Sequence, residues 1–326
     1  MSPPTSIRSS LAEALAGWPP PALDPAGPFS ERIVVLSWVL FAMSAVVLAI
    51  VLIALGLALF GGERWRGRLS GERAIWIGGI AFPVVVLTAL LIWGLSITAY
   101  ASRPITGDEL RVRVSGEMWW WRVTYLDQAG REVAWDANEL HIPAGRPVVL
   151  ELTSADVIHS FWVPRLAGKL DMIPGRVNLL RLTADEPGVF GGQCAEYCGG
   201  PHALMGFVVV AHEPEAFERR LAELAAPAAP PATAEAQRGA QVFDAAGCGA
   251  CHAVRGTEAN GLAGPDLTHV GSRRSLGAGI LPNNRGALGG WIADSQEIKP
   301  GNRMPPYDVL SGPELLALTA YLEGLK

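Results

Sequence analysis

The stretch Cys194-Ala-Glu-Tyr-Cys198-Gly-Gly-Pro-His202-Ala-Leu-Met205 carries the most information about this chain. It places two thiols, an imidazole and a thioether within 12 residues. Sulfur ligands are soft and suit copper, and imidazole suits copper as well. A further histidine, His159, lies 35 positions before Cys194 in the segment Asp156-Val-Ile-His-Ser-Phe-Trp-Val-Pro164. The pattern therefore predicts a copper site that this loop and a distant histidine build together.

The number of thiols indicates how many copper ions the site holds. A single blue-copper centre uses two histidines, one cysteine and a weak methionine. Here a second cysteine lies on the same loop, and two thiolates can each bridge two metal ions. We therefore expect a two-copper cluster with one histidine on each copper, Met205 as a weak ligand of one copper and a backbone carbonyl on the other. The alternatives are a disulfide, a redox dithiol and a Cys₂His₂ zinc site; the spacing with Met205 argues against zinc.

A second cysteine pair indicates a haem. Cys248-Gly-Ala-Cys251-His252 is the attachment signature of c-type haem, in which both thiols bond to the haem and the histidine becomes its proximal ligand. Met304, 52 residues after His252, is the expected sixth ligand, although it could be an ordinary core residue. Histidine and methionine together suit electron transfer. His141, His212 and His269 are assigned no role.

The rest of the soluble chain divides into two parts. Short β-strands with Gly/Pro turns from about Glu109 onward predict a β-sandwich or Greek-key barrel over residues 109–224, with a short helix at Pro214–Leu224. Examples of the expected strands are Leu110–Val114, Trp119–Leu126, Val148–Thr153, Val177–Thr183 and Gly206–Ala211. The Ala/Pro-rich residues 225–236 read as a linker, and residues 237–326 as a helical domain. Its last helix is expected to start at a capping box, Ser311-Gly-Pro-Glu314.

Two apolar runs precede these domains. Residues 33–60 and 74–100 contain no charged side chain, and each exceeds the roughly 20 residues that a helix needs to cross a bilayer. The first is longer than the apolar core of a signal peptide, so we expect an uncleaved hairpin over residues 32–101. The loop between the runs is rich in arginine, whereas residues 1–31 contain only Arg8. The positive-inside rule then places that loop in the cytoplasm, and residues 1–31 and the soluble domains outside it.

Residues 31 to about 224 resemble subunit II of cytochrome c oxidases. The resemblance rests on His159 in its motif, on Lys169–Gly175 (KLDMIPG) and on the Cys194–Met205 loop. It implies a cupredoxin fold with a binuclear CuA centre, held by the side chains of His159, Cys194, Cys198, His202 and Met205 and by the backbone carbonyl of Glu196. In the family, the side chain of that glutamate also reaches a magnesium ion shared with subunit I.

Other features of the resemblance concern electron and proton transfer. Trp119, in Met118-Trp-Trp-Trp-Arg122, matches the position at which an external cytochrome c hands over its electron; Trp120 and Trp121 could equally be plain strand residues. In many members of the family, a glutamate near the start of the second span feeds protons into subunit I. Glu72 is farther from Pro83 than that glutamate, so we expect Glu72 to be an exposed loop residue. The order of Cys248, His252 and Met304 resembles small class I cytochromes c, and Gly264-Pro-Asp-Leu267 resembles the loop beside their haem.

The resemblance implies the electron-transfer subunit of a haem–copper terminal oxidase in a bacterial-type inner membrane. Electrons would pass from an external cytochrome c or another donor to haem c, then to CuA, then to haem a in subunit I, where oxygen is reduced to water and protons are translocated. The expected partners are subunit I and a subunit III. A net charge of -5 argues against a nucleic-acid partner.

Four competing hypotheses remain. Nitrous-oxide reductase also contains CuA, but its catalytic cluster needs many histidines and this chain has six, three of them already assigned. The electron-accepting part of a nitric-oxide reductase is harder to separate. A membrane-anchored copper-delivery protein would have one span, no equivalent of Met205 and no haem. A quinol oxidase subunit II would lack the copper ligands.

Overall fold

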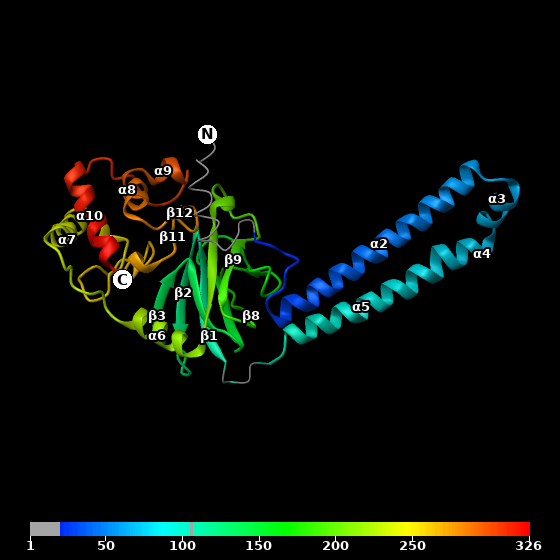
Figure 1. Cartoon of the computed structure of the whole chain (residues 1–326), viewed down its shortest axis with the longest axis horizontal. Coiled ribbons are helices and arrows are strands. Elements are labelled where there is room, and N and C mark those ends of the chain that lie inside the picture. Colours follow the sequence, from blue (N-terminus) through cyan, green and yellow to red (C-terminus); the bar gives the residue numbers. More distant parts are fainter. Residues whose placement is uncertain (1–19, 105–106, 108) are drawn as a thin grey trace. The chain divides into compact units, whose positions relative to one another are not determined.

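The structure, a computed structural model, describes residues 20–104, 107 and 109–326. The part of the expected tail that contains Arg8 lies outside the described residues. The chain divides into two compact units, one of residues 31–104 and one formed by the rest of the chain (Figure 1). The second unit contains a β-sandwich and a helical domain.

The unit of residues 31–104 is a helical hairpin. Its elements are α2 (Pro28–Phe60), α3 (Glu63–Leu69), α4 (Glu72–Ala74), a π-helical segment (Ile75–Ala81) and α5 (Phe82–Ala101). The helices Pro28–Phe60 and Glu72–Ala101 are long and apolar enough to cross a membrane. Pro83, which lacks a backbone N–H, lies two residues after the end of the π-helical segment, as expected where a proline disturbs the helical hydrogen-bond ladder. Glu72 is exposed.

The first part of the other unit consists of two five-stranded sheets. Their strands are β1 (Leu110–Glu117), β2 (Trp120–Leu126), β3 (Glu132–Ala137), β4 (Glu139–Pro143), β5 (Val148–Ser154), β6 (His159–Trp162), β7 (Leu170–Met172), β8 (Asn178–Leu182), β9 (Gly188–Cys194) and β10 (Gly206–His212). The sheet orders are β3-β2-β1-β5-β8 and β4-β10-β9-β6-β7. Apolar side chains from both sheets form one buried core, which includes Trp121, Phe161 and Phe207. This is the expected β-sandwich.

A helical domain follows the sandwich. After α6 (Pro214–Ala225) come α7 (Ala234–Ala245), the short 3₁₀ helices η3 (Cys248–Ala250) and η4 (Val270–Ser272), the β11–β12 hairpin (Ser275–Leu276 and Leu281–Pro282), α8 (Arg285–Ala293), α9 (Ser295–Ile298) and α10 (Gly312–Gly324). The α7 helix begins inside the Ala/Pro-rich segment because the Thr233 hydroxyl caps it by accepting from Ala236 N. The predicted capping box at Ser311 and Glu314 is confirmed.

Helices α7 and α10 cross closely in this domain. A Cβ on Gly239 would lie 2.0 Å from the Ala317 carbonyl oxygen, so only glycine permits this crossing. Phe243 and Tyr321 pack edge to face beside it, with ring centroids 5.7 Å apart. The crossing fixes the scaffold from which the segment with Cys248 and Cys251 extends.

Candidate metal centres

The strand order of the sandwich brings the proposed copper ligands together. β6 pairs with β9 so that Phe161 lies opposite Cys194, and this pairing places His159 beside the end of β9. The chain then turns through the short 3₁₀ helix His202–Leu204 before β10 starts. The loop therefore folds back over its own first cysteine, and Cys194 N donates to the Met205 carbonyl oxygen at 3.1 Å.

The six predicted copper-binding residues form one cluster. Cys194 Sγ lies 3.9 Å from His159 Nδ1, 3.8 Å from Cys198 Sγ and 3.2 Å from the Glu196 carbonyl oxygen. Cys198 Sγ lies 3.5 Å from His202 Nδ1 and 3.9 Å from Met205 Sδ. The donor set thus has one imidazole beside each sulfur, with a carbonyl on one side and a thioether on the other.

The two sulfurs are not joined in a disulfide. Both cysteines are free and buried, and their separation of 3.8 Å is far beyond the roughly 2.05 Å of an S–S bond. Contact with Cys198 lowers the pKa of the Cys194 thiol to about 3, and the same contact raises the pKa of Cys198, because the first thiolate is stabilised by the second thiol. The pair is therefore held close without a covalent bond.

Asp156 orients His159, a role that the sequence analysis did not assign. Its Oδ1 lies 2.9 Å from His159 Nε2, which leaves Nδ1 facing Cys194. Backbone N–H groups of Met118 and Val157 donate to the same carboxylate at 2.8 Å. Burial alone would lower the pKa of His159, but contacts with Cys194 and Asp156 raise it. A carboxylate behind a metal-binding histidine is a common device for fixing the ring, and an aspartate three residues before the histidine was the available signal.

The three consecutive tryptophans have different environments. The Trp119 indole N–H donates to the Cys198 carbonyl oxygen at 2.9 Å, directly behind a predicted ligand. Trp121 is buried in the core against Phe161 and Phe207. Trp120 lies half-buried under the Arg122 guanidinium. Both residues lie in β2, where Trp121 belongs to the core and Trp120 also lines the cavity that contains Cys251 and Met304.

The Glu196 side chain lies apart from the sulfur cluster. Its carboxylate lies 3.7 Å from Lys169 Nζ, and both side chains are about half exposed. Only the backbone of Glu196 contacts the cluster.

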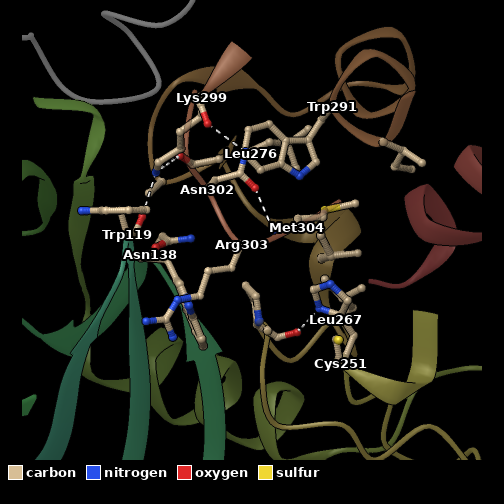
Figure 2. A pocket seen from close by; sticks show the side chains of 18 of the residues that line it. Trp119, Asn138, Cys251, Leu267, Leu276, Trp291, Lys299, Asn302, Arg303 and Met304 are labelled. Atoms are coloured by element: carbon tan, nitrogen blue, oxygen red, sulfur yellow. Dashed lines mark hydrogen bonds between the residues drawn. The ribbon is translucent and has the colours of Figure 1, made fainter. Parts of the chain in front are cut away.

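The four predicted haem-binding residues line one cavity of about 350 Å³ (Figure 2). Cys248, Cys251 and His252 come from the segment after α7, and Met304 comes from the loop before α10. The Met304 backbone is fixed by Ser295 and Asn302, which bond its carbonyl oxygen and its N–H respectively. A planar, largely apolar group with two thiol attachments fits this lining.

His252 is held by the Gly264–Leu267 loop. Its Nδ1 lies 2.7 Å from the Pro265 carbonyl oxygen, which leaves Nε2 available to a metal ion. A Cβ on Gly264 would approach the His252 ring to 2.5 Å. This glycine therefore lets the loop pack directly on the imidazole.

Gly264→Ala is expected to push the His252 ring away and to destabilise the helical domain by about 1–3 kcal/mol. The measurement is thermal unfolding of the full chain, together with the haem optical spectrum. Gly324→Ala is the matched control, because a Cβ there meets nothing within 4 Å. Equal behaviour of the two variants would contradict the packing argument.

Known proteins resemble both domains. A family model described as "Cytochrome C oxidase subunit II, periplasmic domain" matches residues 128–212, and one described as "Cytochrome c" matches residues 236–326. The cytochrome c oxidase subunit 2 of Alkalihalophilus pseudofirmus is 39% identical over 319 residues, which are 94% of this chain and 90% of that protein. The chain belongs to the cytochrome c oxidase subunit II family.

Two further proteins extend this comparison of subunit II. The cytochrome c oxidase subunit 2 of Bacillus subtilis is 32% identical over 277 residues, covering 79% of this chain and 76% of that protein. The crystal structure of the periplasmic domain of subunit II of cytochrome oxidase (CoxB) of Bradyrhizobium japonicum is 31% identical, covers 35% of this chain and 92% of that chain, and has a TM-score of 0.33.

Membership of the subunit II family has direct consequences. The chain is a subunit of a haem–copper oxidase, a membrane complex in which it accompanies subunit I. The family implies copper, and the appended cytochrome c domain implies haem. The residues present fit both groups, since the sulfur and imidazole donors converge without a disulfide and both Cys-x-x-Cys-His thiols share a cavity with Met304.

Proposed function

We propose that this subunit II accepts electrons from a cytochrome c-type donor at its haem c domain and passes them through its copper domain to haem a of subunit I. Oxygen reduction to water and proton translocation would then occur in subunit I. Cys248, Cys251, His252 and Met304 would hold haem c. The copper pair of the CuA type would be held by His159, Cys194, Glu196 (through its carbonyl), Cys198, His202 and Met205.

One observation carries this proposal: Trp119 belongs to both sites. It lines the cavity that contains Cys251 and Met304, and its indole N–H bonds the carbonyl oxygen of the predicted copper ligand Cys198 (Figure 2). When bound, the haem and the copper pair supply reversible one-electron storage. An aromatic side chain that contacts both sites supports direct transfer between them. The donor would therefore meet the haem domain, and Trp119 would act inside the chain.

The same proposal covers the surroundings of the subunit. Residues 32–101 would form a two-helix anchor with the Gly61–Arg73 loop in the cytoplasm. The copper domain (109–224), the linker (225–236) and the cytochrome domain (237–326) would lie on the periplasmic side. A subunit III and a magnesium ion at the subunit I boundary, bound by the Glu196 carboxylate, complete the proposed assembly.

The test is the order of reduction in the purified oxidase. After rapid mixing with a reduced cytochrome c-type donor, the haem c band should change first and the near-infrared band of the copper pair second. Trp119→Phe removes the N–H that bonds Cys198 and should slow only the second phase, whereas Trp65→Phe, which changes an exposed side chain of α3, should slow neither. Reduction of copper before haem would reject the proposed order.

A further inference from the structure

The Lys299 side chain is buried at the junction of the copper and cytochrome domains. It follows α9, is only 2% exposed, and its Nζ donates to three carbonyl oxygens: Trp119 at 2.7 Å, Leu204 at 2.8 Å and Gly277 at 2.9 Å. The first two acceptors belong to the copper domain and the third to the cytochrome domain. A single ammonium group thus joins three chain segments from two domains.

The acceptors lie next to the residues that matter for electron transfer. Leu204 directly precedes the predicted copper ligand Met205, and the indole of Trp119 bonds the carbonyl oxygen of Cys198. On the haem side, the Lys299 carbonyl oxygen accepts from Asn302 Nδ2 at 2.8 Å.

Asn302 in turn connects Lys299 to the haem cavity. Its Oδ1 accepts from Met304 N at 2.8 Å. Figure 2 shows Lys299, Trp119, Asn302 and Met304 around the same cavity. A continuous set of contacts therefore runs from the predicted haem ligand to the copper-binding loop.

Burial of the Lys299 charge is costly, but the three carbonyl acceptors around Nζ match the donors of an ammonium group. Burial lowers the pKa of Lys299 to about 7, because desolvation penalises its charge. Among the described residues, no carboxylate lies within ion-pairing distance of it. An ammonium has three donors and no acceptor, and here all three donors are used. An apolar side chain of similar length would remove all three of these hydrogen bonds to carbonyl groups at the junction.

Other contacts cross the same junction near Lys299. Gly206 N, directly after Met205, donates to the Ala278 carbonyl oxygen at 3.0 Å. Arg303 lies 3.3 Å from Asp156, the aspartate that orients His159. Lys299 differs from the residues in these other contacts in two ways. Its side chain is almost wholly buried, and its ammonium bonds both the copper-binding loop and the Trp119 backbone.

The geometry points to Lys299 as a positioning residue that clamps the Met304 loop to the copper-binding loop and so fixes the separation of the two redox centres. This inference rests on the proposed function. The Lys299 ammonium bonds backbone carbonyl groups and none of the predicted ligand side chains, so it acts on the ligands through Trp119, Leu204 and Asn302. Its loss is expected to shift the equilibrium between clamped and separated domains by about tenfold or more, the effect of losing a charge-assisted hydrogen bond.

The experiment uses the complete oxidase with Lys299→Met and, as the matched control, Lys326→Met at the exposed C-terminus. Haem c is reduced rapidly and electron transfer to copper is followed optically. In Lys299→Met this internal rate should fall by about tenfold or more, while the haem band, the copper band and the rate of haem reduction by the donor stay at wild-type values. Both midpoint potentials are measured as well, so that the rates are compared at equal driving force. Lys326→Met should match the wild type throughout.

A second readout reports the distance between the centres without turnover. The oxidised haem enhances the electron-spin relaxation of the copper pair, and this enhancement should weaken in Lys299→Met. Lys299→Gln retains two donors and should restore part of the internal rate and part of the relaxation enhancement. The same variant replaces Lys299→Met in both measurements if the methionine variant assembles poorly. An unchanged internal rate and unchanged relaxation in Lys299→Met would overturn the clamp. Absence of haem-to-copper transfer in the wild type would instead overturn the proposed function.

Discussion

Cys198→Ser is expected to abolish the two-copper spectrum while leaving the haem band intact. Cys198 Sγ lies within 4 Å of the donor atoms of Cys194, His202 and Met205, so it is the contact common to three of the other ligands. Serine is nearly isosteric, but its hydroxyl is hard and stays protonated, and copper favours soft thiolate. Copper affinity should fall by more than about 100-fold, since even residues behind the ligands cost 10–100-fold.

The measurements are copper content per chain, the electron spin resonance of the shared copper pair, and the haem optical band. Cys248→Ser is the reciprocal control: it should impair covalent haem attachment and leave the copper signal unchanged. Cys194→Ser should behave like Cys198→Ser. An unaltered copper spectrum in either copper-loop variant would show that these sulfurs are not ligands.

The local parts of both sites could be predicted from the sequence because their donors lie close together along the chain. The Cys194–Met205 loop and the Cys248–His252 segment each contain most of the predicted ligands of one site within 12 residues. The predicted strands correspond to β1, β2, β5, β8 and β10, which are apolar or alternating runs. The ranges named from the sequence did not include β3, β4, β6, β7 or β9. Of these, β6 and β7 have four and three residues, which are too few to show a period.

The junction between the domains could not be predicted, because its contacts join residues far apart in sequence. Lys299 meets the Trp119 carbonyl oxygen 180 positions away, and Arg273 meets Asp136 137 positions away. The acceptors of Lys299 are backbone groups, which carry no residue-type signal. The only available hint was that a chain with three lysines places one of them five residues before Met304.

Arg273→Met is expected to produce the largest loss of stability. Its Nε lies 2.8 Å from Asp136 Oδ1, and the two side chains are 5% and 1% exposed. Removal of one partner of a buried ion pair leaves an uncompensated buried charge and costs about 3–5 kcal/mol. The midpoint of thermal unfolding of the full chain should fall by about 10 °C. Arg131→Met, which breaks an exposed pair with Asp127 of similar length, should leave the unfolding midpoint close to that of the wild type.

The pH dependence of this loss follows from the surroundings of Asp136. Burial alone would raise the pKa of that carboxyl, but Arg273 and His141 hold it below the ordinary 3.8, with Arg220 and the carboxylate of Glu139 also nearby. In the wild type, the ionised Asp136 therefore stabilises the fold above about pH 3.8, and this contribution is lost as the pH falls toward the folded-state pKa. When Arg273 is removed, burial is opposed by less positive charge, so the pKa of Asp136 in the folded state rises.

The difference in stability between Arg273→Met and the wild type should therefore be greatest near neutral pH and shrink as the pH is lowered toward 3.8. The measurement is the unfolding midpoint of both proteins across this range. Combining Arg273→Met with Asp136→Asn should cost less than the sum of the two single changes, because both remove the same interaction. A difference independent of pH, or additive costs, would mean that Arg273 stabilises the junction by packing and not by its charge.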